Sequence, residues 1–168
     1  MLHAAIALFL EHGYEKTTTA QIARQAGMSP ASFFAAFENK EALLLALTKI
    51  MFSGQFQKAE GMLAEVKSPL LLYGLETALQ LHITELSEPL RELYVTAYTL
   101  PTTSDFIYRS MLGRLCEIFR PYLPQAHEND FFELEIASAS VTRGFMARKC
   151  DMYFTMERKL RRFLSCCY

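Results

Sequence analysis

Apolar residues recur every three or four positions along most of the chain, the spacing that gathers side chains on one face of an α-helix. Proline and serine residues interrupt this spacing at points that suit the ends of helices. Helices are therefore predicted over residues 2–12, 40 to about 66, 70–86, 91–100, 105–119, 129–149 and 152 to about 165. Since no stretch alternates apolar and polar residues as a strand does, the sequence predicts an all-α protein.

Two further short helices are predicted in the N-terminal part by residues that begin and end helices. Thr18 followed by Gln21 fits a capping box, and Gly27 suits the left-handed conformation that ends a helix. Ser29 followed by Pro30 then begins a second helix. A second short helix presented across a tight glycine turn is the element that enters a DNA major groove.

The residues around these two helices predict how the unit is closed. Phe33 and Phe37 lie one turn apart on the second short helix and form its expected buried stripe. Asn39 is expected to cap the long helix that follows, with Glu41 in its first turn near the positive end of the helix dipole. Tyr14 is expected to fill the core beneath them. Together these signals predict a helix-turn-helix unit.

Residues Ala4 to Leu47 resemble the DNA-binding domain of the TetR family of transcriptional regulators, over about a quarter of the chain. The resemblance rests on Ala5, Leu8–Phe9, Gly13–Tyr14, Thr18, Ile22–Ala23, Ala26–Gly27–Met28–Ser29, Phe37 and Lys40–Glu41–Ala42–Leu43. It implies an all-α fold of about nine helices, with residues 1–48 as a helix-turn-helix DNA-binding head. Residues 49–168 would form a helical body that binds a ligand and dimerises.

The same resemblance implies which side chains contact DNA, and where this chain departs from the family. The implied contacts are Thr18, Gln21, Ser29, Ala31, Ser32, Phe34, Ala35 and Lys40. Lys40 is expected to contact phosphate. Phe34 stands where the family commonly has Tyr, and Ala35 and Ala36 stand where longer polar residues are usual. The helix therefore offers few hydrogen-bonding groups to bases, which leaves methyl contacts to thymine and readout of DNA shape. The basic residues that precede the first helix in the family are not found before Leu2, and we expect this difference to weaken DNA affinity.

The body carries aromatic and soft side chains on the expected inner faces of its helices, where an apolar pocket with a few hydroxyl groups could hold a small effector. The resemblance implies effector contacts among Tyr73, His82, Tyr94, Tyr98, Tyr108 and Met111. Simple core packing is the competing interpretation of these residues. The expected inner face of the helix over residues 70–86 consists of Leu71, Leu75, Ala78, Leu79, His82 and Leu86.

The last two predicted helices carry apolar stripes interspersed with small residues that permit close helix approach. In the family such a pair meets its twin in a four-helix dimer interface. The resemblance implies this role for Leu134, Ala137, Val141, Gly144, Phe145, Met156, Leu160 and Phe163. A homodimer would place two heads at half-sites about one turn (~34 Å) apart, which suits a palindromic operator. The competing interpretation is that the stripes only cover the core of one chain.

Composition and motifs exclude several classes of protein. The 168 residues are 51% hydrophobic and 21% charged, which favours a globular domain over a disordered one. Cys116, Cys150, Cys166 and Cys167 form no C-x-x-C pair, so we expect buried thiols of a cytoplasmic protein, with no metal site and no cofactor. The adjacent cysteines at the end could alternatively sense redox or bind a soft metal. Apolar runs are too short to span a bilayer, and no enzyme motif is found. We therefore expect neither a membrane partner nor an enzyme.

These observations predict a ligand-responsive transcriptional regulator, most often a repressor, that binds double-stranded operator DNA as a homodimer and is released by a small-molecule effector. The net charge of −1 gives no independent sign of a nucleic-acid partner. The alternative is a dimeric helical module of the same fold that binds a ligand or a protein, with a head that has weakened or lost DNA binding. The small, apolar side chains of Ala31, Phe34, Ala35 and Ala36 motivate that alternative.

Overall fold

The computed structural model describes residues 1–62 and 68–167, and within them the chain forms nine α-helices and no strand. These are α1 (Leu2–His12), α2 (Thr19–Gln25), α3 (Pro30–Ala36), α4 (Lys40–Met62), α5 (Pro69–Leu86), α6 (Glu88–Ala97), α7 (Pro101–Phe119), α8 (Glu128–Ala147) and α9 (Met156–Cys167). The predicted all-α fold is confirmed. No helix in the described ranges combines the length and the apolarity that crossing a bilayer requires.

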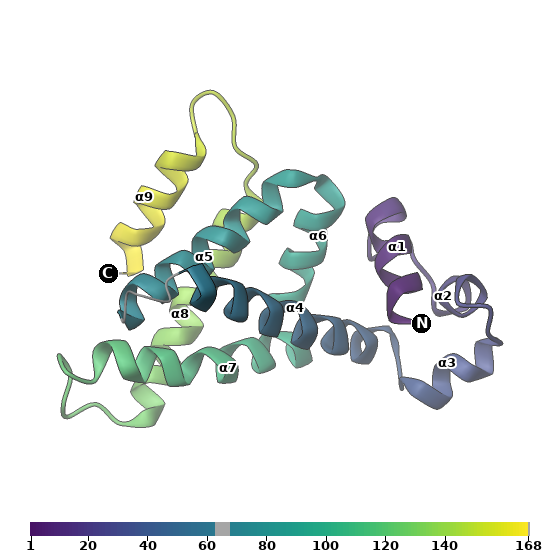
Figure 1. The fold of residues 1–168 in the computed structure, drawn as a ribbon, viewed down its shortest axis with the longest axis horizontal. Coiled ribbons are helices and arrows are strands. Elements are labelled where there is room, and N and C mark those ends of the chain that lie inside the picture. The colour runs from purple at the N-terminus through teal and green to yellow at the C-terminus, as the bar shows by residue number, and fades with distance from the viewer. Residues whose placement is uncertain (63–67, 168) are drawn as a thin grey trace.

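Two clusters of buried side chains divide the molecule into a head and a body. The head consists of α1 to α3 and the first turns of α4, and the remaining helices form the body (Figure 1). Leu43, Leu44 and Leu47 of α4 are buried in the head cluster, whereas Phe52 of the same helix is buried in the body cluster. One continuous helix therefore supplies side chains to both cores. The predicted boundary between residues 48 and 49 falls inside this helix.

The predicted helix boundaries near Pro101 and Met152 differ from the observed ones. Pro101 was expected to end a helix, but it occupies the first turn of α7, where a missing N–H costs nothing. The last helix begins at Met156 rather than Met152. Asp151 does cap a turn, because its Oδ1 accepts hydrogen bonds from the amides of Tyr153 and Phe154, each at 2.8 Å. The predicted end of the long helix near Val66 lies outside the described residues.

The orientation of α5 is the largest difference from the prediction. Its buried residues are Tyr73, Glu76, Thr77, Gln80, Leu81 and Thr84, so a largely polar face points inward. Leu71 and Leu86, which were expected to face inward, are 48% and 75% exposed. The outer apolar face has a neighbour far along the chain, because α9 lies beside α5 (Figure 1). Leu71 and Leu75 line a groove there with Leu160 and Leu164 of α9.

Candidate nucleic-acid interface and body interior

The turn between α2 and α3 has the geometry that the sequence predicts. The Thr18 amide donates to Gln21 Oε1 at 2.7 Å, and the Gln21 amide donates to Thr18 Oγ1 at 3.2 Å, which completes the capping box. Gly27 adopts a φ of 69° just after α2, a conformation that glycine takes without strain. The exposed side chains of Thr18 and Gln21 therefore bond to each other while they shape the start of α2.

The inner side of α3 anchors this helix to the head. The Ser32 amide donates to Ser29 Oγ at 3.3 Å, so Ser29 caps the helix, and Pro30 occupies its first turn as predicted. Phe33 is fully buried, and its ring centroid lies 5.9 Å from that of Phe37. Of the predicted stripe, Phe33 is buried and Phe37 is half-buried against the head core, and this packing fixes which side of α3 faces outward.

The outer side of α3 carries apolar and mostly small side chains. Ala31, Ala35 and Ala36 are exposed, and the Phe34 ring beside them is 58% exposed. The two hydroxyls near the start of the helix, Ser29 and Ser32, lie 3.0 Å from each other. This surface thus presents mainly methyl and phenyl groups. Such groups can contact thymine methyls, but they offer few hydrogen bonds to base edges.

Lys40 fastens the start of α4 to the connector between α1 and α2. Its Nζ donates to the carbonyl oxygens of Tyr14 at 2.8 Å and Thr17 at 3.0 Å, and it lies 4.2 Å from the centroid of the Tyr14 ring. Tyr14 fills the head core as predicted, and this burial is the main cause that raises its pKa to about 12. An ammonium carries three donors, and the bonds to the two carbonyl oxygens use two of them. The third donor is available to a phosphate, so a phosphate contact by Lys40 stays a prediction.

All eight predicted DNA contacts are exposed or half-buried on α2, α3 and the residues that flank them. Their contact with DNA stays a prediction. Two exposed cations of the head, Lys16 and Arg24, were not in the predicted set. Their charge alone marks them as possible phosphate contacts, and that signal was already present in the sequence.

Polar and apolar contacts join the head to the body at α6 and α7. The Glu15 amide donates to Glu92 Oε1 of α6 at 3.2 Å, and the Thr102 amide of α7 donates to Glu41 Oε1 at 2.9 Å. Leu93, next to Glu92, is buried in the head cluster although it belongs to a body helix. A shift of α6 would therefore move side chains that contact the head.

The predicted effector contacts fall into two groups. Tyr73, Tyr94, Tyr98 and Met111 are buried in the body cluster, with exposures of 3%, 2%, 7% and 5%, and Tyr108 is half-buried beside it. His82 instead lies at the surface, with its Nδ1 atom 2.7 Å from the carbonyl oxygen of Ala78. The inward position expected for His82 is wrong because α5 turns the opposite face toward the interior.

The side-chain amides of Gln80 and Gln55 contact the hydroxyls of two buried tyrosines. The Tyr98 hydroxyl donates to Gln80 Oε1 of α5 at 2.7 Å, and the Gln55 amide of α4 contacts the Tyr94 hydroxyl. Burial raises the pKa of Tyr94 to about 12 and that of Tyr98 well above its usual range. Both phenols are therefore neutral and act as hydrogen-bonding groups in the interior.

Two buried carboxylates lie in the same body, and the sequence analysis did not select them. Glu76 is 1% exposed and its Oε1 lies 2.9 Å from a guanidinium nitrogen of Arg114. Burial raises the pKa of Glu76 to about 7, although the Arg114 charge lowers it in part. Glu135 of α8 is 2% exposed, and burial raises its pKa to about 8. Neither stands out in the sequence, because glutamates on helices are usually on the solvent side.

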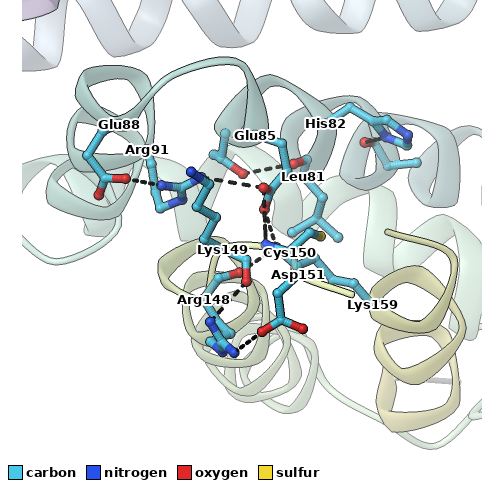
Figure 2. Close-up of polar contacts among 12 residues, drawn as sticks. Leu81, His82, Glu85, Glu88, Arg91, Arg148, Lys149, Cys150, Asp151 and Lys159 are labelled. Atoms are coloured by element: carbon cyan, nitrogen blue, oxygen red, sulfur yellow. Dashed lines mark hydrogen bonds and ion pairs between the residues drawn. The ribbon is translucent and has the colours of Figure 1, made fainter. Parts of the chain in front are cut away.

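A network centred on Glu85 ties α9 to the body, as Figure 2 shows. The fully buried Lys159 donates from Nζ to Glu85 Oε1 and to the carbonyl oxygen of Arg148, each at 2.6 Å. Arg91 of α6 lies 3.4 Å from the other oxygen of Glu85, and the Cys150 amide donates to that oxygen at 3.1 Å. Burial would raise the pKa of Glu85, but these donors and charges outweigh it and lower the pKa.

Only some of the residues predicted for the dimer interface are exposed on the single chain. Leu134, Ala137 and Gly144 are exposed on α8, whereas Val141, Phe145, Met156 and Leu160 are half-buried. Phe163 is 1% exposed and packs against Phe145 within the same chain, at 6.4 Å between ring centroids. Phe163 therefore belongs to the core of its own chain, which differs from the expected interface position. Pairing through the other residues stays a prediction.

Comparison with known proteins gives one family match and several solved structures of similar fold. Residues 1–47 match the family described as "Bacterial regulatory proteins, tetR family". The comparison with curated proteins found no match. Among solved structures, FadR from Thermus thermophilus, a TetR-family transcriptional repressor solved with lauroyl-CoA, has a TM-score of 0.70 at 18% identity over 99% of this chain and 90% of its own. SmeT, the repressor of the Stenotrophomonas maltophilia multidrug efflux pump SmeDEF, has a TM-score of 0.65 at 20% identity over 99% and 85%. FadR from Bacillus halodurans has a TM-score of 0.65 at 15% identity over 97% and 95%.

Proposed function

This chain belongs to the TetR family of bacterial regulatory proteins, and we propose that it is a ligand-responsive repressor that binds a palindromic operator as a homodimer in the cytoplasm. The single observation that carries the proposal is α3. It is capped by Ser29, anchored by Phe33, and presented outward across the Gly27 turn. This is the geometry of a helix that enters the major groove.

Dimerisation is supported by apolar side chains on the outer face of α8. Leu134 is 42% exposed, and Ala137, three residues further along the helix, is exposed on the same side. Contiguous exposed apolar residues mark interaction surfaces more often than single ones do. In the proposed dimer, two α3 helices would reach successive major grooves about one turn (~34 Å) apart.

Effector binding in the body would change the distance between the two heads. The contacts of Glu92 and Leu93 with the head, together with α4, give a direct mechanical connection. An effector that fits the body better in one head arrangement shifts the population toward it. By linkage, an effector that favours a spacing unsuited to the operator lowers DNA affinity by the same factor as DNA lowers effector affinity.

The proposal is tested by titrating the purified protein into DNA from upstream of its own gene, with a shuffled duplex of equal length as the reference. We expect tighter binding to the upstream DNA by at least about a thousandfold at physiological salt, and an affinity that falls as salt rises. The Phe34→Ala variant should bind the upstream DNA more weakly, because it removes a side chain that is 58% exposed on the outer side of α3. Equal binding to both duplexes at every salt concentration would reject the regulator.

The apolar outer side of α3 favours a second candidate function. A head with Ala31, Phe34, Ala35 and Ala36 outward has few groups for base readout. The chain would then be a dimeric helical module that binds a ligand or a protein, with weakened DNA binding. A variant with a basic arm added before Leu2 and the substitution Phe34→Tyr distinguishes the regulator from the module. Sequence-specific binding gained by this variant supports an intact DNA-reading scaffold, and no gain supports the module.

A further inference from the structure

Glu135 occupies an unusual position in the interior of the body. Its side chain comes from the middle of α8 and is 2% exposed. Its Oε2 atom has no hydrogen-bond partner among the described residues. A carboxylate removed from water is costly unless donors reach it, and buried polar atoms nearly always have a partner. Once ionised above its pKa of about 8, Glu135 is therefore a strong acceptor placed where the described part of the chain supplies too few donors.

The polar groups around Glu135 are occupied with one another. The Tyr98 hydroxyl donates to Gln80, the Tyr94 hydroxyl meets the Gln55 amide, and the Tyr73 hydroxyl meets Ser138 Oγ. After burial itself, the Glu135 charge is the next cause that raises the pKa of Tyr98. The interior thus places this acceptor among buried tyrosine side chains, and an ionised carboxylate without donors favours a positively charged group.

An apolar pocket lies against the neighbouring side of α8, and Glu135 is not one of its lining residues. It has a volume of about 220 Å³ between α5, α7 and α8, and its wall includes Leu115, Phe119, Leu134 and Val141. The contact between Tyr73 and Ser138 also lines the pocket. Ser138 follows Glu135 by three residues, so the two side chains are neighbours on one side of α8. The Tyr73–Ser138 contact therefore lines the pocket, and Glu135 lies about one turn before Ser138 on α8.

We propose that the body binds amphipathic primary amines, with the alkyl chain in the Leu115–Val141 pocket and the ammonium group at Glu135. The alkyl chain matches the apolar wall, and the ammonium brings three donors and no acceptor. A fatty acid would instead bring a second carboxylate to the first, and an alcohol would bring one weaker donor. The inference deepens the proposed function, because it assigns a chemical class to the effector of that regulator.

Three ligands with the same chain test the head-group preference. Octylammonium, octanol and octanoate are titrated into the full chain by calorimetry at pH 8.5, where an alkylammonium with a pKa near that of lysine, roughly 10.4, is still charged. We expect octylammonium to bind at least tenfold more tightly than either of the other two. In Glu135→Gln this preference should disappear, with octylammonium no tighter than octanol. Glu133→Gln, an exposed position on the same helix, should keep the wild-type preference.

Several outcomes would overturn the proposal. These are octanol or octanoate binding as tightly as octylammonium, the absence of binding by all three, or an unchanged preference in a folded Glu135→Gln variant. If that variant does not fold, the comparison of the three ligands on the wild-type chain still decides. The DNA titration without ligand separates the two proposals. Specific DNA binding without amine preference rejects only the ligand class, and amine preference without specific DNA binding rejects only the regulator.

Discussion

Lys159 of α9 and Glu85 of α5 form a buried ion pair, with 2.6 Å between Nζ and Oε1. Lys159 has no exposed surface, and the Glu85 side chain is 18% exposed. A lysine ammonium is almost never fully buried without a paired charge, so the position of α9 depends on Glu85. This pair, together with Arg91, connects the C-terminal helix to the helix that contacts the head (Figure 2).

Removing Glu85 should destabilise the chain strongly. In Glu85→Gln the buried Lys159 charge loses its main partner, and loss of one member of a buried pair costs about 3–5 kcal/mol. Lys159→Met should cost less, because Glu85 keeps Arg91 and the Cys150 amide. The double variant should be more stable than Glu85→Gln alone. Urea unfolding measures all three.

The exposed pair of Arg109 and Asp105, with 2.8 Å between Nε and Oδ2, provides the matched control. Asp105→Asn should change the free energy of unfolding by less than about 1 kcal/mol, because surface pairs contribute little. A Glu85→Gln variant as stable as Asp105→Asn would show that α9 does not depend on the buried pair.

Glu135 should make the folded chain less stable as pH rises. Its folded pKa of about 8 lies above the ordinary value of 4.5, so between these values the folded state holds a proton that the unfolded state releases. Stability from this group is therefore present below pH 4.5 and declines up to about pH 8. Glu135→Gln removes the decline, so the variant should match the wild type near pH 4.5 and exceed it by on the order of 3–5 kcal/mol near pH 9.

Thermal and urea unfolding across this pH range measure the difference between the two chains. The raised pKa of Glu76, another buried carboxyl of the body, is present in both chains. Its effect on stability therefore cancels in the difference between them. Glu133→Gln on the solvent side of α8 should leave the pH profile as it is in the wild type. A constant gap between Glu135→Gln and the wild type at all pH values would contradict the raised pKa of Glu135.

Adjacent phenylalanines on α3 should separate stability from DNA affinity. Phe33 is fully buried and Phe34 is 58% exposed. Phe33→Ala should cost about 3–5 kcal/mol of unfolding free energy. Phe34→Ala should stay within about 0.5 kcal/mol of the wild type and weaken DNA binding. Phe34→Tyr adds a hydroxyl at the surface and should tighten DNA binding by about two- to tenfold, the effect of one hydrogen bond. Anisotropy titrations check the affinities, and unchanged binding in both Phe34 variants would remove this side chain from the interface.

Two glycines with positive φ should respond differently to a methyl group. Gly27 has φ 69° with open space around it, whereas Gly13 has φ 84° and faces the Glu92 carboxylate of the body. Gly27→Ala should cost about 1 kcal/mol from backbone strain alone. Gly13→Ala should cost about 2–4 kcal/mol, because ψ of 160° places it in a region that is nearly restricted to glycine. Adding Glu92→Ala should recover part of that loss in thermal unfolding. No recovery in the double variant would mean that the Glu92 carboxylate does not oppose a methyl group at position 13.

Local signals predicted the head well, because its helix ends are set by neighbouring residues. The bonds of Thr18, Ser29 and Asn39 span only three residues, so the sequence alone contains both partners. The face of α5 could not be predicted in this way. Its outer Leu71 and Leu75 line a groove with α9, and its inner Gln80 accepts a hydrogen bond from Tyr98, each partner coming from a distant part of the chain. Glu135 and Glu85 were missed for the same reason, since their burial depends on packing between helices.

The shared helix α4 restricts how this protein can be divided or recombined. Because Leu47 contributes to one core and Phe52 to the other, a cut between them would expose an apolar stripe on each fragment. An isolated N-terminal fragment ending at residue 48 should therefore be poorly soluble, and the intact chain should melt in one cooperative step rather than two. Chimaeras that exchange DNA-reading units would need their junction outside α4.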